Sequence, residues 1–205
     1  MAYSDFTIAK AQEAFNLVIE EDQDVFADVN RSQPSELLQS ILKEYLKLAI
    51  AINSEKSRSE FIIAPVLAEV RRLSNYQMSL FSGKEFNVDT TKGLTGYCDF
   101  ILSYSKEQLY IRTPVTTVVE AKNENIIGGM GQCMAEMVAA QIFNQQAGSL
   151  IETIYGVVTS GTNWRFLTLR DSSVCIDPIE YYIKEVDQIL GILLQAMPKT
   201  QQKVA

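Results

Sequence analysis

Apolar residues recur with the spacing of an α-helix in the first third of the chain. Positions three and four apart share one face of a helix, and this pattern predicts helices over Ser4 to Glu21, from Pro34 onwards, and over about Arg58 to Leu73. A proline fits the first turn of a helix, so Pro34 suits a helix start. Pro65 lies inside the third pattern and predicts a kink or a restart there.

After residue 73 the apolar pattern changes to runs that are typical of strands. These runs are separated by glycine and charged residues, and the last helix is indicated by Asp177 and Pro178, a favourable N-cap and first-turn pair. The predicted elements are strands over 76–88, 95–104 and 114–121, a helix over about 132–146, a hairpin of 154–159 and 164–169, and a closing helix from residue 177.

The order of these elements predicts an α/β fold. A sheet formed by strands that alternate with helices buries both of its faces, so we expect an α/β/α sandwich around a mixed sheet. We divide the chain into an N-terminal helical extension over 1–57, a main domain over 58–197 and a disordered tail over 198–205.

Composition narrows the possible chemistry. With 205 residues of which 47% are hydrophobic, the chain can form one domain with a sizeable core. It contains no histidine, which excludes Ser-His-Asp and Cys-His catalysis and HExxH zinc sites. Catalysis would therefore use carboxylates, lysine, tyrosine or a bound metal.

The cysteines and the hydropathy pattern bear on the compartment. Cys98, Cys133 and Cys175 are widely spaced among apolar residues, and we expect small buried side chains in a reducing cytoplasm. No apolar run approaches the roughly 18 residues that span a bilayer, and the N-terminus has no signal-peptide pattern.

The net charge of −7 argues against tight, autonomous binding to nucleic acid. Residues 1–60 carry 11 acidic and 6 basic side chains, and residues 61–205 carry 14 acidic and 12 basic. Neither part has the basic excess of a high-affinity DNA binder. If DNA is the substrate, we expect weak binding by the isolated chain, with affinity supplied by a homodimer or a partner subunit.

The most informative stretch is the end of the third predicted strand, Val118-Val119-Glu120-Ala121-Lys122. Glu120 and Lys122 are two positions apart, so they project to the same side of a strand. Burying both charges without a purpose would be costly. With Asp99 on the preceding strand they would form a site for a divalent metal and a phosphodiester. The alternatives are a salt bridge at the strand end and a turn or cap role for Asp99.

The element order, with an acid near the second strand and Glu-x-Lys at the end of the third, resembles the PD-(D/E)xK (restriction-endonuclease-like) nuclease superfamily over about residues 58–170. It is most similar to the nuclease domain of type I restriction subunits. The matching segments are Ser59–Leu67 with Glu60, Gly96–Phe100 with Asp99, Val118–Lys122, Gln132, and Val157–Phe166 with its Thr-x-Gly-x-x-Trp pattern. The chain departs from the family at Cys98, which replaces a proline, and at Glu136, which replaces a tyrosine.

This resemblance implies a set of residue roles. Mg²⁺ or Mn²⁺ would be held by Asp99, Glu120 and the Ala121 carbonyl, and Glu60 would complete the metal site. Lys122 would hold or deprotonate the attacking water, and Gln132 would orient Lys122 or contact a backbone phosphate. Glu69 competes with Glu60 for the role of the helix carboxylate.

The sequence thus leads to three functional hypotheses. The first is a metal-dependent nuclease that hydrolyses DNA phosphodiester bonds. The second is a catalytically inactive module of the same fold that acts as a subunit or interaction scaffold. The third is an RNA or nucleotide hydrolase that uses the same residues.

Overall fold

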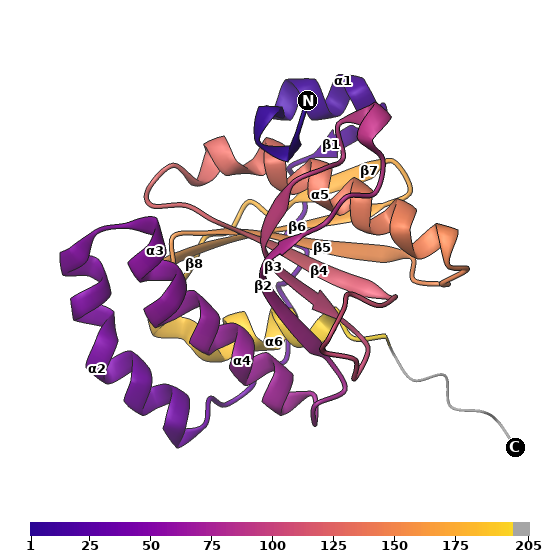
Figure 1. The fold of residues 1–205 in the computed structure, drawn as a ribbon. Coiled ribbons are helices and arrows are strands. Elements are labelled where there is room, and N and C mark those ends of the chain that lie inside the picture. The colour runs from indigo at the N-terminus through magenta and orange to yellow at the C-terminus, as the bar shows by residue number, and fades with distance from the viewer. Residues whose placement is uncertain (199–205) are drawn as a thin grey trace, which may run out of the picture.

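The computed structural model describes residues 1–198 as an eight-stranded mixed sheet with helices on both faces (Figure 1). The strand order is β1-β7-β6-β5-β4-β3-β2, and β8 pairs with β6. The α/β class and the mixed sheet are confirmed. The strands are β1 (Val18–Glu20), β2 (Ser79–Glu85), β3 (Tyr97–Ser103), β4 (Val115–Ala121), β5 (Thr153–Thr159), β6 (Asn163–Arg170), β7 (Ser173–Ile176) and β8 (Tyr181–Tyr182). The α-helices are α1 (Ile8–Phe15), α2 (Glu36–Ile52), α3 (Glu55–Arg58), α4 (Ala64–Leu73), α5 (Ile126–Gln146) and α6 (Val186–Gln195).

The centre of the sheet is formed by β3, β4 and β5. Strand β4 pairs antiparallel with β3 and parallel with β5. All seven residues of β4 are buried, which explains its continuous β-branched sequence, because a central strand is covered on both faces. The predicted strand at 114–121 and the hairpin of β5 and β6 agree with the structure.

Two hydrophobic cores lie on opposite faces of the sheet. One face is covered by α5, with α1 packed against it, and the other by α4 and α6, with α2 outside α4 (Figure 1). Helix α5 approaches β5 closely at Gly156, where a Cβ would lie 2.3 Å from the Met137 Sδ atom. Cys98, Cys133 and Cys175 are free and buried, as the sequence predicts.

Helix α5 alone, among residues 1–198, is long and apolar enough to span a membrane. However, 61% of its most apolar 18-residue window is buried in the fold. It lies between the sheet and α1, so its apolar composition reflects core packing, as in a soluble protein.

The N-terminal region differs from the sequence prediction. The helix expected over Ser4 to Glu21 is confined to α1, which ends at Asn16 in the left-handed conformation (φ 52°). The chain then enters β1, which pairs in parallel with β7 at one edge of the sheet. Residues 1–57 therefore add a strand to the main sheet and are not a purely helical extension.

The third predicted helix begins earlier than expected and is interrupted. Ser54 caps α3: the Ser54 side chain accepts a hydrogen bond from the Ser57 amide. A π-helical segment, Ser59–Ile63, then leads into α4 with Pro65 in its first turn. Proline lacks an N–H, and widening the helix just before it accommodates the missing bond.

The C-terminal region also differs from the prediction. Asp177 is buried and does not cap a helix; its carboxylate accepts hydrogen bonds from the Ile179 amide and the Tyr181 hydroxyl. The chain forms β8 first, and α6 begins only at Val186. Helix α5, in turn, starts six residues before the predicted position, capped by Asn125. The predicted disordered tail lies, apart from Pro198, outside the described residues.

Candidate active site

The predicted chemical residues meet where β3 begins and β4 ends. Phe100 pairs with Val119 and Ile101 with Val118, and continuing this register places Asp99 opposite Glu120. Directly opposed residues of an antiparallel pair project to the same face. The sheet therefore brings the two carboxylates together.

Asp99 is tied to the end of β4. Its Oδ2 atom accepts a hydrogen bond of 2.8 Å from the Ala121 amide, and its side chain remains partly exposed. The Ala121 amide therefore uses Oδ2 and not Oδ1 of Asp99. The proposed metal-ligand role of the Ala121 carbonyl stays a prediction.

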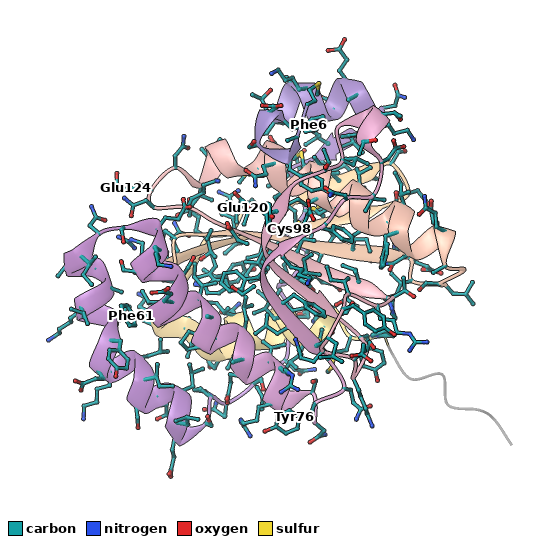
Figure 2. All side chains as sticks on the ribbon, viewed as in Figure 1. Phe6, Phe61, Tyr76, Cys98, Glu120 and Glu124 are labelled. Atoms are coloured by element: carbon teal, nitrogen blue, oxygen red, sulfur yellow. The ribbon has the colours of Figure 1, made fainter. Side chains whose placement is uncertain are left out.

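Glu120 is buried, with 1% of its surface exposed. Its side chain lies in the interior of the fold, as Figure 2 shows. Its Oε1 pairs with the Lys122 ammonium, and its Oε2 accepts a 2.8 Å hydrogen bond from Gln132 Nε2. Burial, and then the negative charge of Asp99, raise its pKa to about 8, although Lys122 offsets part of this effect. Two carboxylates that are held together in this way favour a positive ligand between them.

Lys122 is the charged partner of Glu120 in this arrangement. Burial alone would lower its pKa, but the hydrogen bond and the charge of Glu120 raise the pKa above its ordinary value. The ammonium is therefore retained at neutral pH. Gly129 of α5 makes room for its stem, since a Cβ there would lie 3.0 Å from both Cγ and Cε of Lys122.

Gln132 lies beside the strand-end pair and bonds to two acids, and its expected roles toward Lys122 and a backbone phosphate stay predictions. Its Nε2 donates to Glu120 Oε2 and, over 3.1 Å, to Oε1 of Glu136. Glu136 is completely buried, and burial, followed by the charge of Glu120, raises its pKa well above the ordinary value. The site thus contains a second buried acid that the sequence shows only as a departure from the family pattern.

A groove of about 270 Å³ opens from the site toward α3. It is lined by Glu55, Lys56, Ser59, Glu60, Ser82, Gly83, Asp99 and Phe100. Glu60 lies at this groove with its side chain 54% exposed and forms an ion pair of 2.9 Å with Lys56. The negative charge of Glu55, in contrast, contributes to the raised pKa of both Glu120 and Lys122. Both Glu55 and Glu60 line the groove that contains Asp99, so the role of Glu60 as the helix carboxylate stays a prediction.

Glu69, the other helix carboxylate considered, has a structural role elsewhere. Its oxygens accept two hydrogen bonds from Arg72, at 2.7 and 2.9 Å, and two from Ser35. These bonds join α4 to the start of α2 and lower the pKa of Glu69, with Arg72 as the main cause.

Arg58 positions α3 against the site. This buried guanidinium donates to Asn123, to the Ser160 carbonyl, to Thr162 and to Asn53. It therefore connects α3 to the segment after Lys122 and to the turn between β5 and β6.

That turn corresponds to the Thr-x-Gly-x-x-Trp pattern. Thr159 Oγ1 accepts from the Gly161 amide, and the Trp164 indole donates to the Gly161 carbonyl. Gly161 has a φ of 80°, which favours glycine. Trp164 is fully buried, so the motif forms a rigid turn that presents acceptors to Arg58.

The residues are chemically suited to Mg²⁺. This ion prefers one or two carboxylates and keeps several waters, and Asp99 and Glu120 supply two oxygen ligands with Glu55 nearby. Within residues 1–198, no group of three or more acidic or cysteine side chains could hold a metal ion. An ion at Asp99 and Glu120 would therefore have two side-chain ligands at most, with water as the others.

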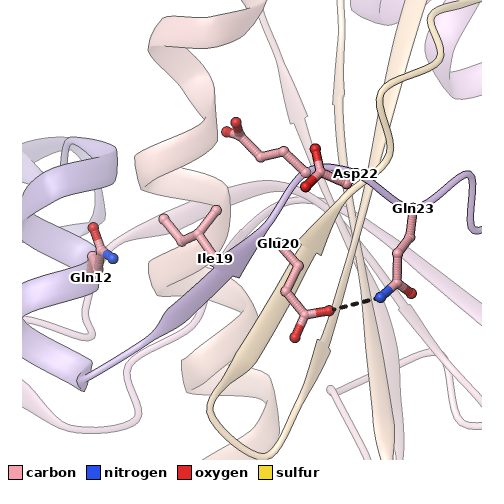
Figure 3. Close-up of a pocket in the computed structure, with 6 residues that line it drawn as sticks. Gln12, Ile19, Glu20, Asp22 and Gln23 are labelled. Carbon is pink, nitrogen blue, oxygen red and sulfur yellow. Dashed lines mark hydrogen bonds between the residues drawn. The ribbon is translucent and has the colours of Figure 1, made fainter.

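A second groove, of about 530 Å³, lies at the opposite edge of the sheet beside β1 (Figure 3). Its acidic residues lie at the end of β1 and directly after it, and Gln23 donates a 3.2 Å hydrogen bond to Glu20. Glu21 and Asp22 are exposed.

Sequence reasoning missed Glu55, Arg58 and the involvement of Glu136. Glu55 and Arg58 are three positions apart in Ser54-Glu55-Lys56-Ser57-Arg58. Ser54 is a recognisable N-cap, which indicates a helix that begins at Glu55 and not at Arg58. Neither the protein-family models nor the curated proteins contain a match to this chain. The candidate site consequently stands on its own geometry.

Proposed function

We propose that this protein is a cytoplasmic, Mg²⁺- or Mn²⁺-dependent nuclease of the PD-(D/E)xK type that hydrolyses DNA phosphodiester bonds. One observation carries the proposal. Asp99 and Glu120 oppose each other on neighbouring strands, and the Lys122 ammonium is paired with Glu120 at the same strand end. Two carboxylates with a fixed cation provide both metal ligands and charge stabilisation for a phosphoryl group.

Each residue has a distinct task in this proposal. Asp99 and Glu120 would hold the metal, which, when bound, activates water and neutralises phosphate charge. Lys122 keeps its proton and stabilises the negative charge that develops on the phosphoryl oxygens. Glu55 lines the groove beside Asp99 and adds negative charge near the metal position, and Arg58 holds its helix in place.

The first test is cleavage of plasmid and single-stranded DNA by the purified chain with Mg²⁺ or Mn²⁺. We expect Glu120→Ala and Lys122→Ala each to lower the cleavage rate at least about a hundredfold, because each removes a ligand or a stabilising charge. The melting temperature of each variant shows whether it is folded.

Glu124→Ala, which removes an exposed carboxylate two residues after Lys122, is the matched control and should cleave like the parent protein (Figure 2). In the same assay, Glu55→Gln should raise the Mg²⁺ concentration needed for cleavage more than Glu60→Gln does. Cleavage that survives both Glu120→Ala and Lys122→Ala would refute the proposed site. RNA tested in parallel decides between a DNA and an RNA hydrolase.

A second candidate function is a non-catalytic scaffold of the same fold. It is favoured by one observation: both oxygens of Glu120 already have protein donors, Lys122 and Gln132. The buried Glu120 carboxyl group therefore has hydrogen-bond partners at both oxygens without a bound ion. A protein that stays inert on DNA and RNA with each metal, and whose melting temperature does not respond to Mn²⁺, would support this function.

A further inference from the structure

Glu136 is a buried acid that the proposed reaction does not use. It lies on α5 one turn beyond Gln132, and none of its surface is exposed. Oε1 accepts a hydrogen bond from Gln132 Nε2, whereas Oε2 is buried without a hydrogen-bond partner among the described residues. An unpaired buried polar atom lowers the stability of the folded protein, so an apolar residue of similar size would make the fold more stable at this position.

The hydrogen bonds of Gln132 indicate why a carboxyl group is present at position 136. Its amide nitrogen has two hydrogens, and it faces two acceptors, Glu120 Oε2 at 2.8 Å and Glu136 Oε1 at 3.1 Å. The amide nitrogen, and not the carbonyl oxygen, faces both acids, so each acid accepts one hydrogen bond from Gln132 at these two oxygens. Without Glu136, the amide would have one acceptor and could rotate about its terminal torsion, which has a broad energy profile.

We propose that Glu136 is a positioning residue that locks the Gln132 amide, so that Gln132 offers only its carbonyl oxygen to a substrate. A non-bridging phosphate oxygen can only accept hydrogen bonds, so the locked amide has nothing to donate to it. A substrate-side partner of the Gln132 carbonyl must therefore be an O–H or N–H donor, and the attacking water is the donor that every phosphodiester hydrolysis provides. This second part depends on the proposed function, whereas the amide lock does not.

The lock can be tested by NMR on the metal-free protein. The Gln132 side-chain N–H signals are assigned by their loss in Gln132→Leu. We expect both hydrogens to exchange slowly with solvent in the parent protein. In Glu136→Met at least one should exchange at least about tenfold faster, since it loses its acceptor. Glu136→Gln keeps a carbonyl acceptor and should restore slow exchange. Gln141→Met, farther along α5, is the control.

A structural role for Glu136 predicts a different result. In that case Glu136→Met would lower the melting temperature and leave the exchange of both Gln132 hydrogens slow, which would overturn the proposal. The locking role predicts an unchanged or higher melting temperature, because methionine removes the unpaired oxygen. If Glu136→Met does not fold, fast exchange in folded Glu136→Gln would equally refute the lock.

Kinetics test the role of the carbonyl. If the protein cleaves DNA, Glu136→Met should lower kcat about tenfold or more with little change in KM, as is usual when a supporting residue is lost. A higher KM with unchanged kcat would indicate a phosphate contact and refute this part. If the parent protein cleaves nothing, the proposed function and the role of the carbonyl fail together, while the exchange measurement still decides the lock.

Discussion

At the scale of single residues, the site is defined by how Glu120 is stabilised. A buried carboxylate needs donors or a nearby cation. Here Lys122 and Gln132 supply them, but Asp99 opposes them with a like charge. The result is an acid whose charged form is disfavoured in the metal-free protein, although a divalent ion would reverse this balance.

The raised pKa of Glu120 predicts how stability depends on pH. Its ordinary value is 4.5 and its value in the folded protein is about 8, so the folded state holds this proton more tightly than the unfolded state. The resulting stabilisation is complete below about pH 4.5 and is lost as the pH rises through 8. Glu120→Gln should therefore show a flatter decline in melting temperature between pH 5 and 8 than the metal-free parent protein does.

Glu13→Gln, at an exposed position of α1, is the control for this comparison and should follow the parent profile. Parallel pH profiles of the parent protein and Glu120→Gln would mean that Glu120 is not perturbed by burial. Added Mg²⁺ should reduce the decline in the parent protein, because metal binding favours the deprotonated carboxylate.

At the scale of elements, helix α5 forms one side of the site. It carries Gln132 and Glu136 and approaches Lys122 through Gly129. The same helix receives α1 at Gly131, where a Cβ would lie 2.3 Å from the backbone of Thr7. The glycines within α5 thus serve close packing, although glycine is a weak helix former.

These two glycines provide a matched pair of substitutions. Gly129→Ala places a Cβ 2.8 Å from Val158 and 3.0 Å from the Lys122 stem, whereas Gly131→Ala meets only the α1 segment. We expect each to lower the free energy of unfolding by about 1–3 kcal/mol, measured by denaturant titration. Only Gly129→Ala should also displace Lys122 and lower DNA cleavage per folded molecule. Equal cleavage by both variants would show that this contact does not position Lys122.

At the scale of the whole molecule, the charge conflicts with the usual electrostatics of DNA binding. The net charge is −7, and acidic residues also follow β1 at the far edge of the sheet (Figure 3). Most non-specific DNA affinity comes from phosphate neutralisation by Lys and Arg. A nuclease of this composition would depend on its metal and on a second subunit for affinity.

We accordingly expect weak DNA binding by the isolated chain, with a Kd of about 10⁻⁵ M or weaker at physiological salt. Fluorescence anisotropy with labelled duplex and single-stranded DNA measures this, with Ca²⁺ in place of Mg²⁺ to limit cleavage. Adding the divalent ion should strengthen binding, because it screens Asp99 and Glu120. Nanomolar binding without any divalent ion would contradict the expectation.

The sequence by itself determined the class of the fold and the centre of the site. Strand β4, with its β-branched run and its terminal Glu120 and Lys122, could be identified because a central strand has a strong local pattern. The predicted placement of Asp99 beside it also agrees with the register of β3 and β4.

Only the tertiary structure decided which groups surround that pair. Three examples are the pairing of β1 with β7, the placement of Glu55 in the groove beside Asp99, and the amide bridge from Gln132 to Glu136. Each depends on contacts between elements or on the exact rotation of a helix. Local periodicity gives the face of a helix only approximately, and a π-helical segment such as Ser59–Ile63 shifts it further. Side-chain partners across elements depend on packing, which a single sequence does not specify.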